Sequence, residues 1–140
     1  GNGRWGQKRK KGRNFGHLHG VSVVKKVVKS SIKLNIPVIT FYVFSTENWR
    51  RPKTEINFLF KLITHYFKKN IDEVVVNGIK INLIGKISKL PFKIKSTLRK
   101  VQLLTKNNNK ILVNLAINYG SKDELLESFK KIKKKILTLI

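Results

Sequence analysis

Three short runs of β-branched and aromatic residues alternate along this sequence with four longer segments of helical periodicity. The run over residues 37–43 is apolar on both faces, which is typical of a buried parallel strand. Helices are expected over 14–34, 54–76, 91–106 and 121–139, strands over 37–43, 79–84 and 111–117, and loops over 1–13 and 44–54. Because alternating strands and helices require crossover connections, the sequence predicts an α/β fold, with a mainly parallel sheet flanked by helices in a single domain over residues 1–140.

Polar residues at the ends of the helical segments predict where those helices begin and end. Asn35 is expected to end the first helix. Thr54 is expected to cap the start of the second. Ser121 and Glu124 have the spacing of a capping box at the start of the last.

The composition excludes several classes of protein. Cysteine is absent, which excludes disulfide scaffolds, zinc fingers and thiol catalysis. No apolar run reaches the roughly 18–20 residues that a membrane-spanning helix needs. Hydrophobic residues make up 41% of the chain, which is enough for a buried core.

The net charge of +24, from 31 Lys and Arg against 7 Asp and Glu, would attract nucleic acid, anionic lipid or phosphorylated substrates. The basic residues are mostly Lys and are spread over nearly every segment, whereas base readout and bidentate phosphate binding favour Arg. Lys, Ile and Asn also share A/T-rich codons. A biased genome therefore explains this composition as readily as a polyanionic partner.

Three segments are expected at the carboxyl ends of strands, where ligands collect in open parallel sheets: 1–5, 44–52 and 118–121. In the first, Gly1 and Gly3 let backbone N–H groups approach phosphate oxygens, and the Arg4 guanidinium adds donors. A plain turn is the alternative interpretation of these residues.

Arg13 and His17 follow at the start of the first helix, whose N-terminal N–H groups favour negative charge. For His17 alone, a hydrogen-bonded surface histidine is the alternative. The segment 45–51 combines two hydroxyls, a carboxylate, an amide, an indole and two guanidiniums directly after a strand. Since no fold needs that mixture for stability, the sequence predicts a ligand-binding loop there.

The helix over 54–76 is apolar around more of its circumference than one packing face requires. Its apolar residues are Ile56, Phe58, Leu59, Phe60, Leu62, Ile63, Tyr66 and Phe67. Either the helix is buried on two sides, or one side lines an apolar cavity roughly 22 Å long. The second arrangement, beside phosphate-binding cations, would suit a substrate with a diphosphate head and a hydrocarbon tail.

Five motifs along the whole chain resemble those of the cis-prenyltransferases, and most closely bacterial undecaprenyl diphosphate synthase (isoprenyl transferase). They are Gly1-Asn2-Gly3-Arg4-Trp5, the Arg13…Gly16-His17…Gly20 spacing, Phe44-Ser45-Thr46-Glu47-Asn48-Trp49-x-Arg51-Pro52, Thr105-Lys106-Asn107-Asn108 and Asn118-Tyr119-Gly120. The resemblance implies a homodimeric, Mg²⁺-dependent α/β enzyme that condenses isopentenyl diphosphate onto farnesyl diphosphate. The product would be a polyprenyl diphosphate, a lipid carrier for cell-wall synthesis. A cytoplasmic location is expected, and weak attachment to a membrane surface through the last helix would suit an enzyme that releases a lipid product.

The resemblance also implies roles for individual residues. Asn48 takes the family's position for the proton-accepting step, and because an amide is a poor base we expect it to position the proton or the diphosphate that receives it. The substrate would be bound by Gly1, Asn2, Gly3, Arg4, Trp5, Arg13, His17, Ser45, Thr46, Glu47, Trp49 and Arg51.

Two family features fall outside the chain. The family's chief metal ligand, an Asp, would immediately precede Gly1, so no metal ligand is expected here. An Arg…Arg-x-Ser pattern for isopentenyl diphosphate and a metal-binding Glu would lie beyond Ile140. The sequence is therefore interpreted as a fragment or the product of a decayed gene, which by itself would not incorporate isopentenyl diphosphate.

Three alternatives stay open at this stage. The chain could be a non-catalytic scaffold subunit of such an enzyme, or a basic nucleic-acid-binding protein, although no nucleic-acid partner is expected. In the last helix, Leu125, Phe129, Ile132 and Ile136 form an apolar stripe beside several lysines. That stripe predicts a helix packed on the sheet, with attachment to a membrane surface as the alternative.

Overall fold

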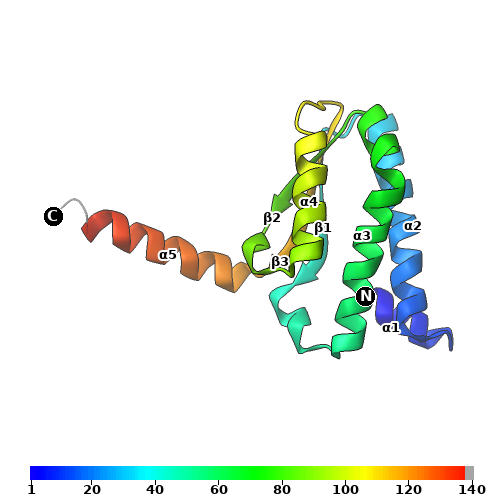
Figure 1. The fold of residues 1–140 in the computed structure, drawn as a ribbon, viewed down its shortest axis with the longest axis horizontal. Helices are drawn as coiled ribbons and strands as arrows, with labels where there is room; N and C mark the ends of the chain where they lie inside the picture. The colour runs from blue at the N-terminus through cyan, green and yellow to red at the C-terminus, as the bar shows by residue number, and fades with distance from the viewer. Residues whose placement is uncertain (138–140) are drawn as a thin grey trace.

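The computed structural model describes residues 1–137, and its elements follow the predicted alternation of helices and strands (Figure 1). The helices are α1 (Asn2–Lys8), α2 (Gly12–Lys33), α3 (Lys53–Val76), α4 (Phe92–Leu104) and α5 (Ser121–Leu137). The strands are β1 (Val38–Ser45), β2 (Ile79–Ile84) and β3 (Ile111–Tyr119), and the short 3₁₀ helices are η1 (Thr46–Arg50) and η2 (Ile87–Lys89). The last two positions of the predicted helix 121–139 lie outside the described residues.

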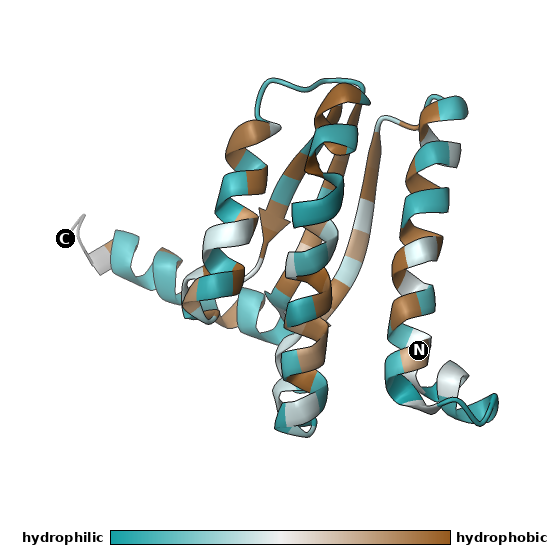
Figure 2. Cartoon of the chain, turned by 45° about the vertical axis from the view of Figure 1, so that its right-hand side comes forward, coloured by the Kyte–Doolittle hydropathy of each residue, from teal (hydrophilic) through white to brown (hydrophobic). Residues whose placement is uncertain are grey.

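The three strands form one parallel sheet in the order β1-β3-β2, which confirms the predicted sheet. The central strand β3 contributes the buried residues Val113 and Ile117 to the core. Phe44 of β1 and Leu98 of α4 complete that core, both almost fully buried. Figure 2 shows the apolar strands beside α3 and α4, so the core lies between the sheet and these helices.

The prediction that the strand over 37–43 is buried on both faces is wrong. In the described sheet β1 is an edge strand, because it pairs with β3 alone. Its residues alternate between exposed and partly buried, and Tyr42 is 77% exposed. Valine, isoleucine and aromatic residues favour a strand at the edge as well as at the centre of a sheet, so composition did not distinguish the two.

The prediction of a loop over residues 1–13 is also wrong, since α1 lies within it and packs against α2. Gly3 and Gly6 are the buried residues of α1. A Cβ atom on Gly16 of α2 would collide with the backbone carbonyl of Asn2. Glycine disfavours an isolated helix, so this short helix depends on close packing between two glycine-bearing surfaces.

Most predicted boundaries hold to within two or three residues. Asn35 follows the end of α2 with a φ of 55°, the left-handed conformation expected of a residue that ends a helix. Thr54 is not the cap of α3, because the helix begins at Lys53 after the extended Pro52. The loop expected after residue 43 is shorter than predicted, since β1 continues to Ser45 and η1 follows it directly.

The last helix does not pack on the sheet as expected. Figure 1 shows α5 projecting away from the remaining elements. Five large apolar side chains on it are 54–68% exposed: Leu125, Leu126, Phe129, Ile132 and Ile136. An amphipathic pattern records only that one face is apolar and not what covers that face. No helix among residues 1–137 is long and apolar enough to cross a membrane.

Candidate diphosphate-binding site

Glu55, in the first turn of α3, gathers three basic side chains from different parts of the chain. Its carboxylate accepts hydrogen bonds from Arg13 Nε at 2.8 Å and from Arg13 Nη2 at 3.1 Å. His17 Nε2 lies 3.0 Å from Glu55 Oε1, and Arg51 Nη1 donates to the same oxygen at 3.1 Å. Arg51 lies one helical turn before Glu55, whereas Arg13 and His17 come from α2. We call these four residues the Glu55 cluster.

The electrostatics of the cluster leave a surplus of positive charge. Burial by itself raises the pKa of the Glu55 carboxyl, but hydrogen bonds from Arg13 and His17 and the charges of Arg13 and Arg51 lower that pKa below its usual range. Glu55 is therefore ionised at neutral pH and offsets one of the two guanidinium charges. Both guanidinium groups stay partly exposed, with 36% of Arg13 and 30% of Arg51 accessible. The cluster can therefore bind an anion through donors that Glu55 holds in place.

The start of the chain lies against this cluster. A Cβ atom on Gly3 would lie 3.0 Å from Cζ of Arg13, so glycine at this position leaves room for the guanidinium. The Asn2 side chain packs closely on Gly20, where a Cβ atom would collide with it. Gly3 thus lies beside Arg13, and Asn2 lines the same cavity as His17.

Trp5 is surrounded by aromatic and basic groups. Its ring is stacked on Phe15 at 6.0 Å and tilted against His19 at 5.1 Å, measured between centroids. Arg9 lies over the other part of the indole, with Cζ 3.9 Å from the centroid. Arg4, by contrast, is exposed.

An open cavity of about 670 Å³ adjoins the cluster. Its polar end is formed by Gly1, Asn2, Trp5, Gly16, His17, His19 and Gly20. Its apolar walls come from three elements: Val21, Val23 and Val24 of α2, Phe41, Tyr42 and Val43 of β1, and Leu59, Leu62 and Ile63 of α3. His17 belongs to both the cluster and the cavity, so a cationic site and an apolar space meet at one side chain.

Of the two arrangements considered for the helix over 54–76, the structure supports the one with a cavity. Ile56, Phe60 and Phe67 are buried in the core, whereas Leu62 lines the cavity without belonging to the core. The helix therefore has two apolar sides with different surroundings.

The loop after β1 contains the other predicted residues. The Oδ1 atom of Asn48 accepts a hydrogen bond from the backbone N–H of Ser45 at 3.1 Å, while the Ser45 side chain pairs with the Asn48 backbone. This capping box starts η1. With its carbonyl oxygen used in this way, Asn48 has its side-chain NH₂ available to donate to a ligand.

Trp49 connects this loop to the end of β3. Its indole Nε1 donates to Oδ1 of the buried Asn118 at 2.7 Å, and Asn118 Nδ2 donates to the Lys86 carbonyl at 3.0 Å. Asn118 has a φ of 52°, a conformation that asparagine tolerates better than most residues. Asn118, which the resemblance included as a motif residue without a role, therefore fixes the indole.

The contacts given for Thr46 and Glu47 are with residues outside the Glu55 cluster. Thr46 packs against Gly120 at the start of α5. Glu47 is exposed, and hydrogen bonds from its own backbone N–H and from Ser45 lower its pKa. Arg51 therefore shares the Glu55 carboxylate with Arg13 and His17, whereas these contacts of Thr46 and Glu47 do not involve that carboxylate.

The described residues do not fit a Mg²⁺ ion. No group of three or more His, Asp or Glu side chains converges within residues 1–137. The buried carboxylate of Glu55 already accepts hydrogen bonds from three basic side chains. A metal ion bound to Glu55 would have to displace those basic side chains from its carboxylate.

Sequence reasoning missed Glu55 as a site residue, because an acidic residue in the first turn of a helix also stabilises the helix itself. Two signals were present. Glu55 is one of only 7 acidic residues in a chain of net charge +24, and it lies four residues after Arg51. The sequence analysis also did not single out His19, which lines the cavity and contacts Trp5 and Phe15.

The chain is thus an α/β protein with a parallel sheet and a cluster of basic side chains that adjoins an apolar cavity. Comparison with known proteins is more specific. The family model described as "Putative undecaprenyl diphosphate synthase" matches residues 1–139, and the chain belongs to this family.

Individual relatives agree with that assignment. The chain is 43% identical over 136 residues to an isoprenyl transferase of Clostridium tetani, covering 97% of this chain and 53% of the relative. It is 40% identical over 137 residues to an isoprenyl transferase of Streptococcus pneumoniae, covering 98% and 54%. The chain thus spans about half the length of these curated relatives.

Two solved structures share the fold. The lavandulyl diphosphate synthase of Lavandula x intermedia, in complex with dimethylallyl diphosphate, superimposes with a TM-score of 0.92 at 26% identity, covering 99% of this chain and 59% of that one. A probable undecaprenyl diphosphate synthase of Campylobacter jejuni superimposes with a TM-score of 0.76 at 33% identity, covering 84% and 57%. These matches confirm the predicted fold and family.

Proposed function

We propose that this chain is the part of a cis-prenyltransferase that binds the allylic substrate, farnesyl diphosphate. The observation that carries the proposal is that His17 contacts Glu55 at 3.0 Å and also lines the apolar cavity. A diphosphate at the Glu55 cluster would therefore have its hydrocarbon chain beside the cavity. Both halves of an amphiphilic substrate are accommodated by adjacent residues.

In the proposed reaction, the bond between C1 of the allylic substrate and its diphosphate oxygen breaks. C1 then bonds to the terminal alkene carbon of isopentenyl diphosphate, which leaves positive charge on the internal alkene carbon. A proton leaves the CH₂ group next to that internal carbon and passes to a diphosphate oxygen, which gives the new double bond. Arg13 and Arg51 would stabilise the charge that develops on the departing diphosphate. Because Glu55 holds both guanidinium groups in the free protein, they need little reorganisation when the bond breaks.

The cavity would take up the hydrocarbon chain as it grows. Each CH₂ group removed from water contributes about 0.8 kcal/mol, which favours the extended product inside the cavity. Leu59, Leu62 and Ile63 offer no polar group that would retain water there. We propose that Asn48 donates its NH₂ to a diphosphate oxygen and so positions the group that receives the proton, since an amide is a poor base.

Binding measurements on this chain test the proposal without requiring turnover. Isothermal titration with farnesyl diphosphate, inorganic pyrophosphate and farnesol separates the headgroup from the tail. We expect farnesyl diphosphate to bind more tightly than either of the others. Equal affinity for farnesyl diphosphate and pyrophosphate would refute the proposed role of the cavity.

Titration of the same protein with duplex DNA tests the nucleic-acid alternative. If the net charge served nucleic acid, duplex DNA would bind tightly at physiological salt and farnesyl diphosphate would not displace it. We expect weak binding that disappears as the salt concentration rises, because the lysines are spread over the chain.

Two further expectations about the complete protein stay predictions. One is that it forms a homodimer, which sedimentation equilibrium would measure. The other is weak attachment to the membrane surface, and the exposed apolar stripe and lysines of α5 support it. Co-sedimentation with anionic and zwitterionic vesicles measures that attachment, and Phe129→Glu should reduce it.

A further inference from the structure

A second apolar space lies between α3 and α4, and it shares no lining residue with the cavity beside the Glu55 cluster. Its volume is about 570 Å³, within the range of sites that hold small molecules. It is lined by Phe67, Lys68 and Ile71 of α3 and by Phe92, Lys93, Ser96, Thr97, Lys100, Val101 and Leu104 of α4. We call this space the α3–α4 groove.

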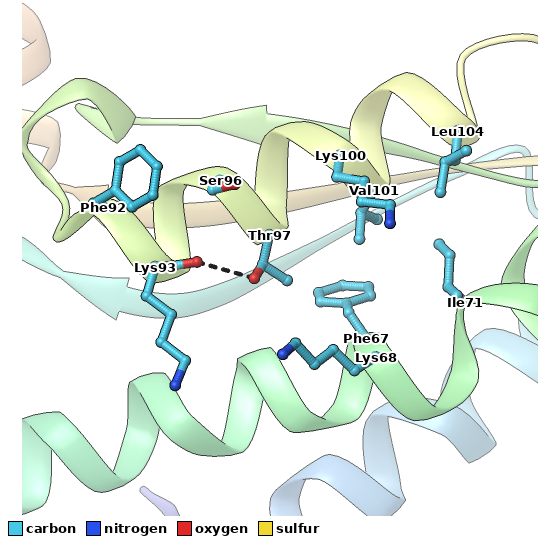
Figure 3. Close-up of a pocket in the computed structure, with 10 residues that line it drawn as sticks. All are labelled: Phe67, Lys68, Ile71, Phe92, Lys93, Ser96, Thr97, Lys100, Val101 and Leu104. Carbon is cyan, nitrogen blue, oxygen red and sulfur yellow. Dashed lines mark hydrogen bonds between the residues drawn. The ribbon is translucent and has the colours of Figure 1, made fainter.

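Most of the positive charge lies toward one end of the groove and most of the apolar side chains lie toward the other. Figure 3 shows Lys68 and Lys93 extending into the space between the two helices, while Phe67, Val101 and Leu104 gather further along, with Lys100 beside Val101. From Lys93 to Leu104 the helix rises about 16 Å, so the groove suits an elongated rather than a compact ligand.

The charged end continues into a neighbouring hollow of about 350 Å³. Lys68 and Lys93 line both spaces, and the hollow adds Lys61 and His65. Positive charge is therefore concentrated where the groove and the hollow meet.

Acidic side chains do not neutralise this charge. The ion pairs formed by lysines of the described chain involve Glu73 and Glu127, and Lys61, Lys68, Lys93 and Lys100 take part in none of them. No Asp or Glu lines the groove or the hollow. The charge is thus available to a bound anion.

The apolar end offers few hydrogen bonds. Thr97 Oγ1 donates to the Lys93 backbone carbonyl at 2.9 Å, so that hydroxyl is already used within α4. Phe67 and Val101 form a buried floor that a hydrocarbon chain can contact. Phe92 is 79% exposed at the charged end, and a ligand lying over it would remove that surface from water.

We propose that the α3–α4 groove binds an anionic amphiphile, with a singly phosphorylated or comparable headgroup at Lys68 and Lys93 and a straight hydrocarbon chain along Phe67, Ile71 and Leu104. An acidic amphipathic helix of a protein partner would need cations along its whole length. In this groove a single lysine, Lys100, lies near Val101, whereas Lys68 and Lys93 lie together where the groove meets the hollow that Lys61 and His65 line. This site is distinct from the one proposed for the allylic substrate.

The absence of cysteine allows a site-specific test. Ser96→Cys places a single thiol in the groove, and Ser30→Cys places a thiol at another exposed position, on α2, as the control. The rate of alkylation is measured with dodecyl phosphate below its micelle concentration, with dodecanol and with inorganic phosphate. At a concentration of dodecyl phosphate about ten times its Kd, the groove thiol should react about tenfold more slowly, because only unbound protein reacts.

Charge-reversed variants identify the headgroup contact. Lys68→Glu with Lys93→Glu should abolish the protection. Lys26→Glu with Lys33→Glu makes the same change in net charge on α2 and should leave it intact. Equal protection by dodecanol, protection that survives Lys68→Glu with Lys93→Glu, or no protection of the groove thiol would each overturn the proposal.

Two further additions distinguish the sources of the ligand. Protection by phosphatidylglycerol vesicles, but not by phosphatidylcholine vesicles, would assign the amphiphile to a membrane. Protection by dodecyl phosphate alone would assign it to a free metabolite. If an acidic amphipathic peptide protects the thiol and dodecyl phosphate does not, the groove binds a protein and the proposal is wrong.

Discussion

His17 and Glu55 lie 38 positions apart in the sequence, and their side chains meet with Nε2 3.0 Å from Oε1, each only 7% exposed. The contact joins the first turns of α2 to the first turn of α3. It places the imidazole at the edge of the apolar cavity, with Arg13 and Arg51 on the same carboxylate.

Replacing the carboxylate tests whether Glu55 positions the cluster. Glu55→Gln keeps the shape of the side chain but removes the charge that holds Arg13 and Arg51. Since a hydrogen bond to a charged group contributes about 1.5–3 kcal/mol, and both guanidinium groups are partly exposed, we expect a loss of about 1–2 kcal/mol in the free energy of unfolding. Farnesyl diphosphate should bind about tenfold more weakly, which corresponds to about 1.4 kcal/mol.

Titration calorimetry and urea unfolding measure the two effects separately. Glu73→Gln is the matched control, because Glu73 pairs with Lys25 and Lys29, and these three residues belong neither to the Glu55 cluster nor to the cavity lining. If Glu73→Gln weakens ligand binding as much as Glu55→Gln, the effect is one of overall charge and not of positioning.

The lowered pKa of Glu55 predicts how stability depends on pH. A carboxyl group whose pKa is lower in the folded than in the unfolded state stabilises the fold above its usual pKa, near 4.5, and loses that contribution as the pH falls through the folded value. Wild-type protein should therefore lose more stability than Glu55→Gln between about pH 5 and pH 3. Urea unfolding across this range gives both curves, and parallel curves would contradict the assignment.

The close packing of α1 on α2 predicts that Gly16→Ala is destabilising. The added Cβ atom would collide with the backbone carbonyl of Asn2, and overpacking costs about 1–3 kcal/mol, more than the helix propensity of alanine restores. Gly1→Ala is the control, since no atom lies within 4 Å of its Cβ position. Hydrogen exchange should show faster exchange in α1 for Gly16→Ala only.

Leu62 tests the apolar cavity without disturbing the core. Leu62→Glu places a carboxylate among apolar side chains and should weaken farnesyl diphosphate binding at least about tenfold, the equivalent of 1.4 kcal/mol. Binding of inorganic pyrophosphate should change little. The matched control is Leu103→Glu on α4, a residue that is 63% exposed and lines neither cavity nor groove. Equal losses in the two variants would show that Leu62 does not contact the ligand.

The hydrogen bond from Trp49 to Asn118 predicts a change in fluorescence. In a Trp5→Phe background, Asn118→Gly keeps the left-handed backbone available but removes the acceptor of the indole N–H. We expect the emission of Trp49 to shift to longer wavelength and its quenching by acrylamide to increase. Asn109→Gly, in an exposed turn, is the matched control, and an unchanged spectrum in Asn118→Gly would contradict the contact.

The sequence by itself determined the alternation of helices and strands and the family, because periodicity and motif spacing are local properties of the chain. It also identified Arg13, His17 and Arg51 as candidate residues of an anion-binding site. It did not identify Glu55 as their common partner, since the contacts with His17 and Arg13 span 38 and 42 positions and only the four-residue spacing from Arg51 is local.

Only the tertiary structure decided the remaining features. An apolar run is equally compatible with the centre or the edge of a sheet, and pairing alone made β1 an edge strand. Two glycine-bearing helices pack closely only when both are present, so α1 was not visible in its own sequence. The apolar stripe in the sequence predicted that α5 has an apolar face. Whether that face is buried or exposed depends on the direction in which the helix leaves the sheet, and here it projects away and the face is exposed. In each case the outcome depends on which surfaces are buried against parts of the chain that are distant in sequence.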